Sequence, residues 1–172
     1  MATTYQAIAS IISNGTTATV TFSSIPSTYT DLLIRTSARS SSAGASDQIN
    51  IVFNGDTSTN YSITQVYGNN SAAGSFGTTS TTQGRINYID VSGQTANTFG
   101  IGEIYIPNYA AATTKQTLGF SASESNDTTT PYVVNVGFLY RGTSAISSIT
   151  LQTAGSNYVS GSRFDLYGIT HI

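Results

Sequence analysis

Apolar and polar residues alternate with a period of two along most of this chain. The pattern is clearest where Val134, Val136 and Phe138 share one face of a long extended run. A period of two puts successive side chains on opposite faces of a strand, and no useful length keeps the 3.6-residue period of a helix. The expected strands lie within residues 5–12, 18–22, 32–35, 49–54, 85–91, 99–106, 118–122, 132–140, 149–151 and 163–169.

These strands, about ten in number and separated by turn residues, predict an all-β fold. We expect a single antiparallel β-sandwich of jelly-roll type over residues 1–172, because neither an internal repeat nor a domain linker interrupts the pattern. A chain of this length suits one domain and can bury a proper core.

The last strand, Arg163 to Ile169, is expected to close the sandwich by pairing with strands formed much earlier in the chain. Its alternation predicts Phe164 and Leu166 as core residues, with Asp165 and Tyr167 on the opposite face. We therefore place Asp165 and Tyr167 at the surface or in an interface. Gly168 is expected to break the strand near its end.

Several local signals refine the picture. Asn14-Gly15 between two extended runs predicts a hairpin. A change of phase beside Gly100 and Gly102 predicts a β-bulge. Residues 61–67 keep no clean period, so that a bulged strand and a short helical turn both remain open. Arg35 and Arg39 are expected to face water.

Residues 68–84 are rich in glycine, serine and threonine, and Phe76 is their only large apolar residue. A loop of this length inside a compact domain is usually functional or mobile. We expect it to be an arm that contacts a partner, with Gly74, Ser75, Phe76 and Gly77 as the candidate contact residues.

Composition narrows the class of function. Only 8% of the residues are charged, the net charge is −2 and there are no cysteines, so that neither a disulfide framework nor a thiolate metal site is possible. No basic stripe is present to neutralise a phosphate backbone, which argues against nucleic-acid binding. No basic segment precedes an apolar run at the start of the sequence, so a secretory signal peptide is not expected. No apolar run reaches the roughly 18 residues that a membrane span needs.

Candidates for chemistry are few, and we expect neither a catalytic residue nor a cofactor. His171 reads as a solvated residue near the chain end rather than part of a catalytic triad. Residues 56–60 begin like a calcium-binding loop, but Tyr61 stands where glycine is needed, and an Asx turn explains the same residues. Glu103 and Asp165 could face each other as a glycosidase pair or simply face solvent, and the solvated reading is favoured.

The eleven tyrosines, without any tryptophan, raise the possibility of sugar binding through aromatic faces. Tyr88, Tyr105, Tyr140 and Tyr167 fall within strands, where half-buried packing is the commoner role. We expect packing to account for these four side chains.

Four stretches together resemble a known family. They are the runs 23–32 (SSIPSTYTDL), 60–69 (NYSITQVYGN), 102–109 (GEIYIPNY) and 164–169 (FDLYGI). In order and spacing they resemble small virion structural proteins of tailed bacteriophages, especially phages of aquatic bacteria. The resemblance implies a β-sandwich module that decorates heads or forms part of tails and fibres, often as a trimer, and it implies no catalytic residues.

The leading expectation is a phage head decoration or head-fibre module, since a self-standing fibre would need a shaft with repeats or heptads, and none is seen. We expect a homotrimer on the external surface of the virion, made in the cytoplasm of the host bacterium, with the major capsid protein or another fibre chain as its partner. The alternative is a receptor-binding tail or fibre module that recognises cell-surface glycans.

Overall fold

The computed structural model describes residues 4–124, 126 and 131–171. These residues form twelve strands and no helix. The strands are β1 (Thr4–Ile12), β2 (Thr19–Phe22), β3 (Asp31–Ala38), β4 (Asp47–Phe53), β5 (Tyr61–Asn69), β6 (Ala73–Thr81), β7 (Gly84–Ile89), β8 (Gly100–Ile106), β9 (Lys115–Ser123), β10 (Tyr132–Tyr140), β11 (Ile149–Gln152) and β12 (Arg163–Thr170).

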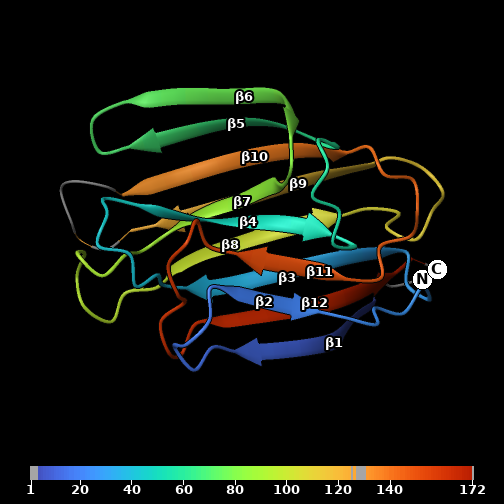
Figure 1. The fold of residues 1–172 in the computed structure, drawn as a ribbon, viewed down its shortest axis with the longest axis horizontal. Coiled ribbons are helices and arrows are strands. Elements are labelled where there is room, and N and C mark those ends of the chain that lie inside the picture. Colours follow the sequence, from blue (N-terminus) through green and yellow to red (C-terminus); the bar gives the residue numbers. More distant parts are fainter. Residues whose placement is uncertain (1–3, 125, 127–130, 172) are drawn as a thin grey trace.

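The strands form two antiparallel sheets packed face to face (Figure 1). An eight-stranded sheet has the order β1-β12-β3-β8-β9-β10-β5-β6, and a four-stranded sheet has the order β2-β11-β4-β7. The pairs β2–β11, β3–β8, β4–β7 and β5–β6 are nested one inside the next along the chain. Nested pairing is what a long hairpin rolled into two sheets produces, so the predicted antiparallel jelly-roll sandwich is confirmed.

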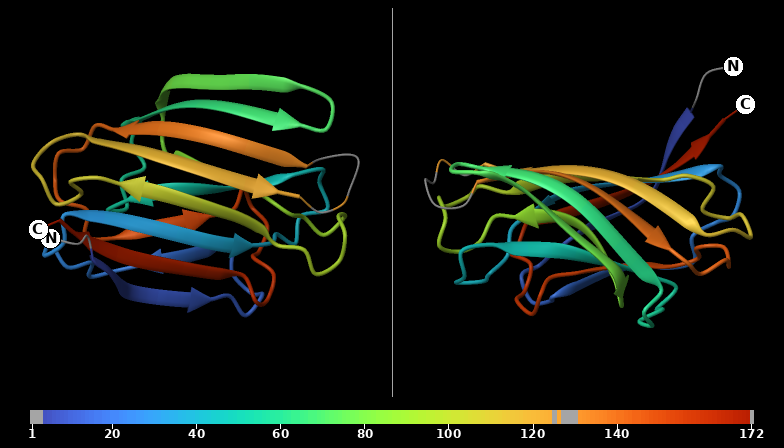
Figure 2. Two further views of the ribbon diagram at one scale, coloured as in Figure 1. Left: turned by 180° about the vertical axis from the view of Figure 1, so that it is seen from behind. Right: turned by 90° about the horizontal axis from the view of Figure 1, so that it is seen from above.

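Two additions widen the larger sheet to eight strands. The pair β9–β10 is inserted between β8 and β5, and β12 and β1 extend the sheet beyond β3. Seen from behind, the eight-stranded sheet lies in front, and no other described part of the chain covers it (Figure 2). We call this uncovered side the outer face.

The core lies between the sheets. Phe53, Tyr61, Phe138 and Tyr140 form an aromatic cluster, in which the rings of Tyr61 and Tyr140 stack at 4.9 Å and that of Phe53 meets Tyr140 edge-on at 5.4 Å. Burial raises the pKa of Tyr61, whose hydroxyl accepts a hydrogen bond from the Phe53 amide at 2.9 Å. Aromatic contacts of this kind add to the stabilisation that comes from burial alone.

The closing strand packs at the other end of this core. Phe164 and Leu166 on β12 are fully buried, as predicted, and Phe164 meets the ring of Tyr158 edge-on at 4.7 Å. The prediction that Gly168 breaks the strand is wrong. β12 runs through Gly168 to Thr170. The residue is glycine for a packing reason, because the ring of Tyr29 lies where a β-carbon would point.

The hairpin predicted at Asn14-Gly15 is also wrong. β1 pairs with β12 and β2 pairs with β11, so the turn carries the chain from one sheet to the other. Gly15 has a φ of 93°, which explains the turn signal.

The predicted bulge at Gly100–Gly102 is absent, since β8 pairs with β3 and with β9 without a register shift. The change of phase has another cause. Ile104 and Ile106 point into the core, whereas Ile101 points outward and is exposed.

Residues 68–84 are not a loop. Most of them form the end of β5 and the whole of β6, a strand at the edge of the larger sheet. Residues 61–67 are a strand and not a helical turn, but the strand itself is regular: β5 pairs with β10 in unbroken register, and the extra residue of the register shift against β6 lies on β6, between Thr78 and Thr81. The period looked broken because Val66 is apolar on the outer face.

Arg39 is buried rather than solvated. Its guanidinium donates hydrogen bonds to the carbonyl oxygens of Gln94, Thr95 and Thr98 at 2.7–2.9 Å. Arg35 faces water as predicted.

Candidate interaction surface

The strand β9 has its large apolar side chains on the solvent side of the sheet, the reverse of the usual arrangement. Every residue that it turns into the sandwich is polar or glycine, while its large apolar residues Leu118 and Phe120 point outward and are 57% and 59% exposed. Gly119 belongs to the inward set, where an added β-carbon would approach the carbonyl oxygen of Glu103 to 2.9 Å. The apolar side chains of β9 are therefore left for the outer face.

The inward side of β9 is polar, and hydrogen bonds hold it at both ends, whereas the buried hydroxyl of Ser121 between them has no partner among the described residues. The ammonium group of Lys115, which is buried, donates to the carbonyl oxygens of Ala111, Thr113, Thr143 and Ser144 at 2.6–3.1 Å. Ser123 at the other end donates to a carboxylate oxygen of the buried Asp90 at 2.6 Å. These contacts fix which side of β9 turns inward.

Residues in register across a sheet share a face, so the pairing defines the outer face. One row runs across all eight strands as Ser10, Asp165, Arg35, Glu103, Phe120, Asn135, Val66 and Ser75. The adjacent row places Ile101, Ala122 and Val133 side by side on β8, β9 and β10. Ile101 and Val133 are 58% and 65% exposed.

These side chains form one apolar patch, which we define as Val66, Ile101, Leu118, Phe120 and Val133. All five are large, more than half exposed and drawn from the four neighbouring strands β5, β8, β9 and β10. Single exposed apolar residues are ordinary, whereas a contiguous patch rimmed by polar residues marks an interaction site.

Charges lie beside the patch in closed pairs. On the row that holds Phe120, Arg35 contacts Glu103 at 2.7 Å, and on β12 Arg163 contacts Asp165 at 2.8 Å. The hydrogen bond that the Arg35 guanidinium donates to Glu103 raises the pKa of Arg35. This part of the rim is therefore polar, and the charges of each pair cancel.

The ring of Phe120 separates two shallow hollows. One, of about 410 Å³, is bounded by Arg35, Ile101, Glu103 and Ala122. The other, of about 770 Å³, lies toward the edge strand and is bounded by Val66, Ser75 and Asn135, among others. Phe120 and Val133 contact both hollows, so the surface is a ridge between two depressions rather than a plane.

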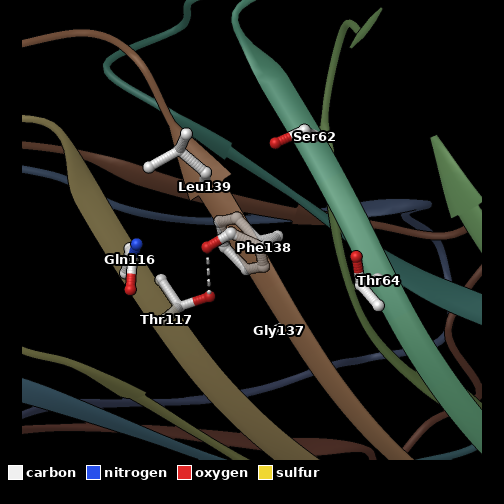
Figure 3. A pocket seen from close by; sticks show the side chains of 7 residues that line it. All are labelled: Ser62, Thr64, Gln116, Thr117, Gly137, Phe138 and Leu139. Atoms are coloured by element: carbon white, nitrogen blue, oxygen red, sulfur yellow. Dashed lines mark hydrogen bonds between the residues drawn. The ribbon is translucent and has the colours of Figure 1, made fainter. Parts of the chain in front are cut away.

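A smaller, more polar hollow lies farther along the same strands (Figure 3). Ser62 and Thr64 of β5 lie on one side, Gln116 of β9 on the other, and Gly137 forms the floor between them. Because glycine leaves the floor open and hydroxyl and amide groups surround it, this hollow suits a polar contact at the rim of the patch.

The four candidates on β6 do not form one surface. Ser75 lies on the outer face opposite Val66, whereas Phe76 pairs with the buried Gln65 and therefore points to the inward side. Its ring lies 4.8 Å from the guanidinium carbon of Arg85. Gly74 packs against the ring of Tyr67, which leaves no room for a β-carbon. Gly77 is on the outer face with Thr64.

Asp165 and Tyr167 are on the outer face, as expected, but on β12 near the opposite edge. Tyr167 borders a hollow of about 200 Å³ together with Tyr5, Leu33 and Arg35. β3, β8, β9, β10 and β5 separate β12 from β6, so the structure does not bring the two predicted groups together. The patch between them is what the sequence analysis missed.

A hydrogen-bonded cluster around the carboxylate of Asp31 lies at the end of the outer face near the chain termini. Asp31 is buried, and its side chain contacts the ring Nε2 of His171 at 2.6 Å, the hydroxyl of Tyr105 and the amide of Asn108 at 2.8 Å. Burial opposes ionisation of Asp31, but these hydrogen bonds prevail and lower its pKa. Burial and the bond to Asp31 raise the pKa of Tyr105 to about 12. His171 is therefore not a free tail residue.

The other candidates for chemistry have structural explanations. Asp56 accepts hydrogen bonds from Ser58, Asn60 and Tyr140, which lower its pKa and form the Asx turn weighed against a calcium loop. Glu103 and Asp165 occupy the same row with Arg35 between them, and each contacts an arginine. Tyr140 is buried and Tyr88, Tyr105 and Tyr167 are partly buried, in agreement with packing roles.

Over the described part of the chain, no three acidic, histidine or cysteine side chains come together as a metal site would require. The same residues include no helix that could cross a membrane. Comparison with protein-family models, with curated proteins and with solved structures found no match to this chain.

Proposed function

We propose that this chain is a non-enzymatic structural protein of a bacteriophage particle, a head decoration or head-fibre module bound to the outside of the capsid. The observation that carries the proposal is the wide outer face, an apolar patch with a polar rim on an otherwise weakly charged jelly-roll sandwich. A surface of this kind serves to hold other protein, because its centre offers contact area and its rim excludes water.

The resemblance of four stretches of the sequence to phage virion proteins supports the same proposal. In this proposal the protein is made in the bacterial cytoplasm and functions as a homotrimer on the external surface of the virion. Its partner there is the major capsid protein or another fibre chain.

Cryo-electron microscopy of the particle tests the proposal directly. We expect density that fits the sandwich on the outside of the capsid. Density for this chain at the tail tip alone would exclude a head module.

A second candidate is a receptor-binding tail or fibre module for cell-surface glycans. Tyr5, which is 59% exposed, and Tyr167 border a hollow with Arg35, and aromatic faces beside a hydrogen-bond donor suit a sugar ring. Saturable binding of purified protein to host cells or to a glycan array, abolished by Tyr5→Ala, would favour this candidate.

The third possible function is that of an enzyme, such as a polysaccharide depolymerase. The proposal expects no loss of polysaccharide viscosity on adding the protein. Loss of viscosity that is abolished by Glu103→Gln would overturn the non-enzymatic assignment.

A further inference from the structure

The geometry points to a specific contact: we propose that copies of this chain bind one another through the outer face, with β9 at its centre. This inference deepens the expected self-association by naming the surface that produces it. It rests on the shape and chemistry of the face and does not depend on where the protein sits on a virion.

The first step concerns size. Strands in a sheet lie about 4.8 Å apart and rise about 3.4 Å per residue, so the eight strands span roughly 34 Å by 25 Å, or about 850 Å². A standard protein interface covers about 800 Å² on each partner. The outer face alone is therefore large enough for a stable contact between two folded copies.

The second step concerns the layout of the face. Phe120 and Leu118 lie on β9, one of the two central strands of the eight, and both are more than half exposed. Toward one edge, Arg35 and Glu103 form part of the rim, and toward the other lies Ser75. An apolar centre with an aromatic residue, surrounded by a polar rim, is the anatomy of protein interfaces and of their energetic centres.

The third step concerns charge. Three register rows run across all eight strands: one holds Phe120, one holds Ile101 and Val133, and one holds Leu118. The charged residues of these rows are Arg35, Glu103, Arg163 and Asp165, and they form two closed ion pairs. Two identical faces can therefore approach without facing unpaired like charges, even though the whole chain has a net charge of −2.

The same chemistry disfavours other occupants. A nucleic acid or an anionic membrane would require unpaired basic groups, and on this face both arginines of the three rows are paired. A glycan would require several hydrogen-bonding groups at the centre, where Ile101, Phe120 and Val133 offer only carbon and Asn135, beside Phe120, offers one amide. A second copy presents the matching apolar centre and the matching paired rim.

Symmetry then predicts which side chains meet. In a closed assembly in which the patches of all copies meet at one rotation axis, as in a trimer, the centre of the patch lies nearest that axis. Phe120 is at that centre, so we expect it to contact Phe120 of the neighbouring copy. The hollows on either side of Phe120 give the neighbour's ring a place to pack.

Native mass spectrometry of the purified protein at micromolar concentration tests the contact. We expect an oligomer that Phe120→Asp converts to monomer, with affinity weakened at least about 100-fold, as for a central aromatic residue of an interface. The matched control is Thr21→Asp, at an exposed position of β2 on the other sheet, which leaves the oligomer intact. Far-ultraviolet circular dichroism confirms that both variants are folded.

Crosslinking provides a second test that requires no loss of binding. The chain has no cysteine, so Phe120→Cys introduces a single thiol. A short bis-maleimide should produce a covalent dimer of Phe120→Cys and none of Thr21→Cys. A monomeric wild type, or an oligomer that survives Phe120→Asp, would overturn the inference, whereas absence of the protein from the capsid would affect only the proposed function.

Discussion

Lys115 is the only lysine of the chain, and replacing it by methionine tests how the inward side of β9 is stabilised. Methionine has nearly the same length but donates no hydrogen bond. The replacement removes the donor that joins residues 111–113 to residues 143–144 through four carbonyl oxygens at 2.6–3.1 Å.

The expected loss follows from two opposing effects. An ammonium group supplies three protons, and a hydrogen bond from a charged donor contributes about 1.5–3 kcal/mol. Against this, methionine avoids the cost of burying a charge, which is several kcal/mol. Thr113, Thr143 and Ser144 are exposed, so their carbonyl oxygens can partly rehydrate. We expect Lys115→Met to lower the free energy of unfolding by about 2–4 kcal/mol and Tm by about 5–15 °C.

Urea unfolding followed by far-ultraviolet circular dichroism measures the change in the free energy of unfolding, and the slope m is expected to stay constant. Gln116→Met is the matched control, because the neighbouring side chain is exposed on the outer face and makes none of these bonds. A loss below about 1 kcal/mol for Lys115→Met, beside an unchanged control, would refute the view that the ammonium group joins the two segments.

Three further predictions follow from buried contacts. Hydrogen bonds lower the pKa of Asp31 in the folded state, so its contribution to stability is present above the unfolded pKa near 3.8 and is lost as pH falls through the folded pKa. Urea midpoints measured from pH 6 downward should therefore depend less on pH in Asp31→Asn than in the wild type, and identical pH profiles would contradict this. Gly168→Ala places a β-carbon against the ring of Tyr29 and should cost about 1–3 kcal/mol in thermal unfolding, whereas Gly137→Ala, whose β-carbon meets its nearest atom at 3.6 Å, should be tolerated. Equal effects of the two substitutions would argue against the clash. Arg39→Lys should cost about 1–3 kcal/mol in urea, since an ammonium group cannot reproduce the fork of hydrogen bonds to three carbonyl oxygens, and a neutral result would show that the fork is dispensable.

The sequence was sufficient for the fold wherever one face of a strand is buried. Phe164 and Leu166, and likewise Val134 and Val136, were predicted inward and are buried, because burial on one side imposes a period of two. β6 was missed for the opposite reason. This edge strand contributes little to the core and is held by backbone pairing to β5, which leaves no mark on side-chain hydrophobicity.

The candidate surface escaped prediction although its signal was present. The apparent bulge at Gly100–Gly102 arose because Ile101 is apolar on the outer face while Ile104 is apolar on the inner one. Leu118 and Phe120 produce the same conflict on β9, where the inward positions are Thr117 and Ser121. A conflict of phase can mean a bulge or a strand with apolar residues turned outward, and only the pairing register distinguishes the two.

The nested strand pairing also determines when the protein can fold. β1 with β12 joins residues 4–12 to residues 163–170, and β2 with β11 joins residues 19–22 to residues 149–152. During synthesis, local pairs such as β5–β6 and β9–β10 can form on the ribosome, but the four-stranded sheet stays incomplete until β11 has emerged and the eight-stranded sheet until β12 has emerged. Folds dominated by such distant pairings fold in milliseconds to seconds. Each new chain therefore completes its sandwich only after translation of residues 149–170. Until then its core-facing residues are exposed, and only dilution or chaperones keep them from aggregating with those of other chains.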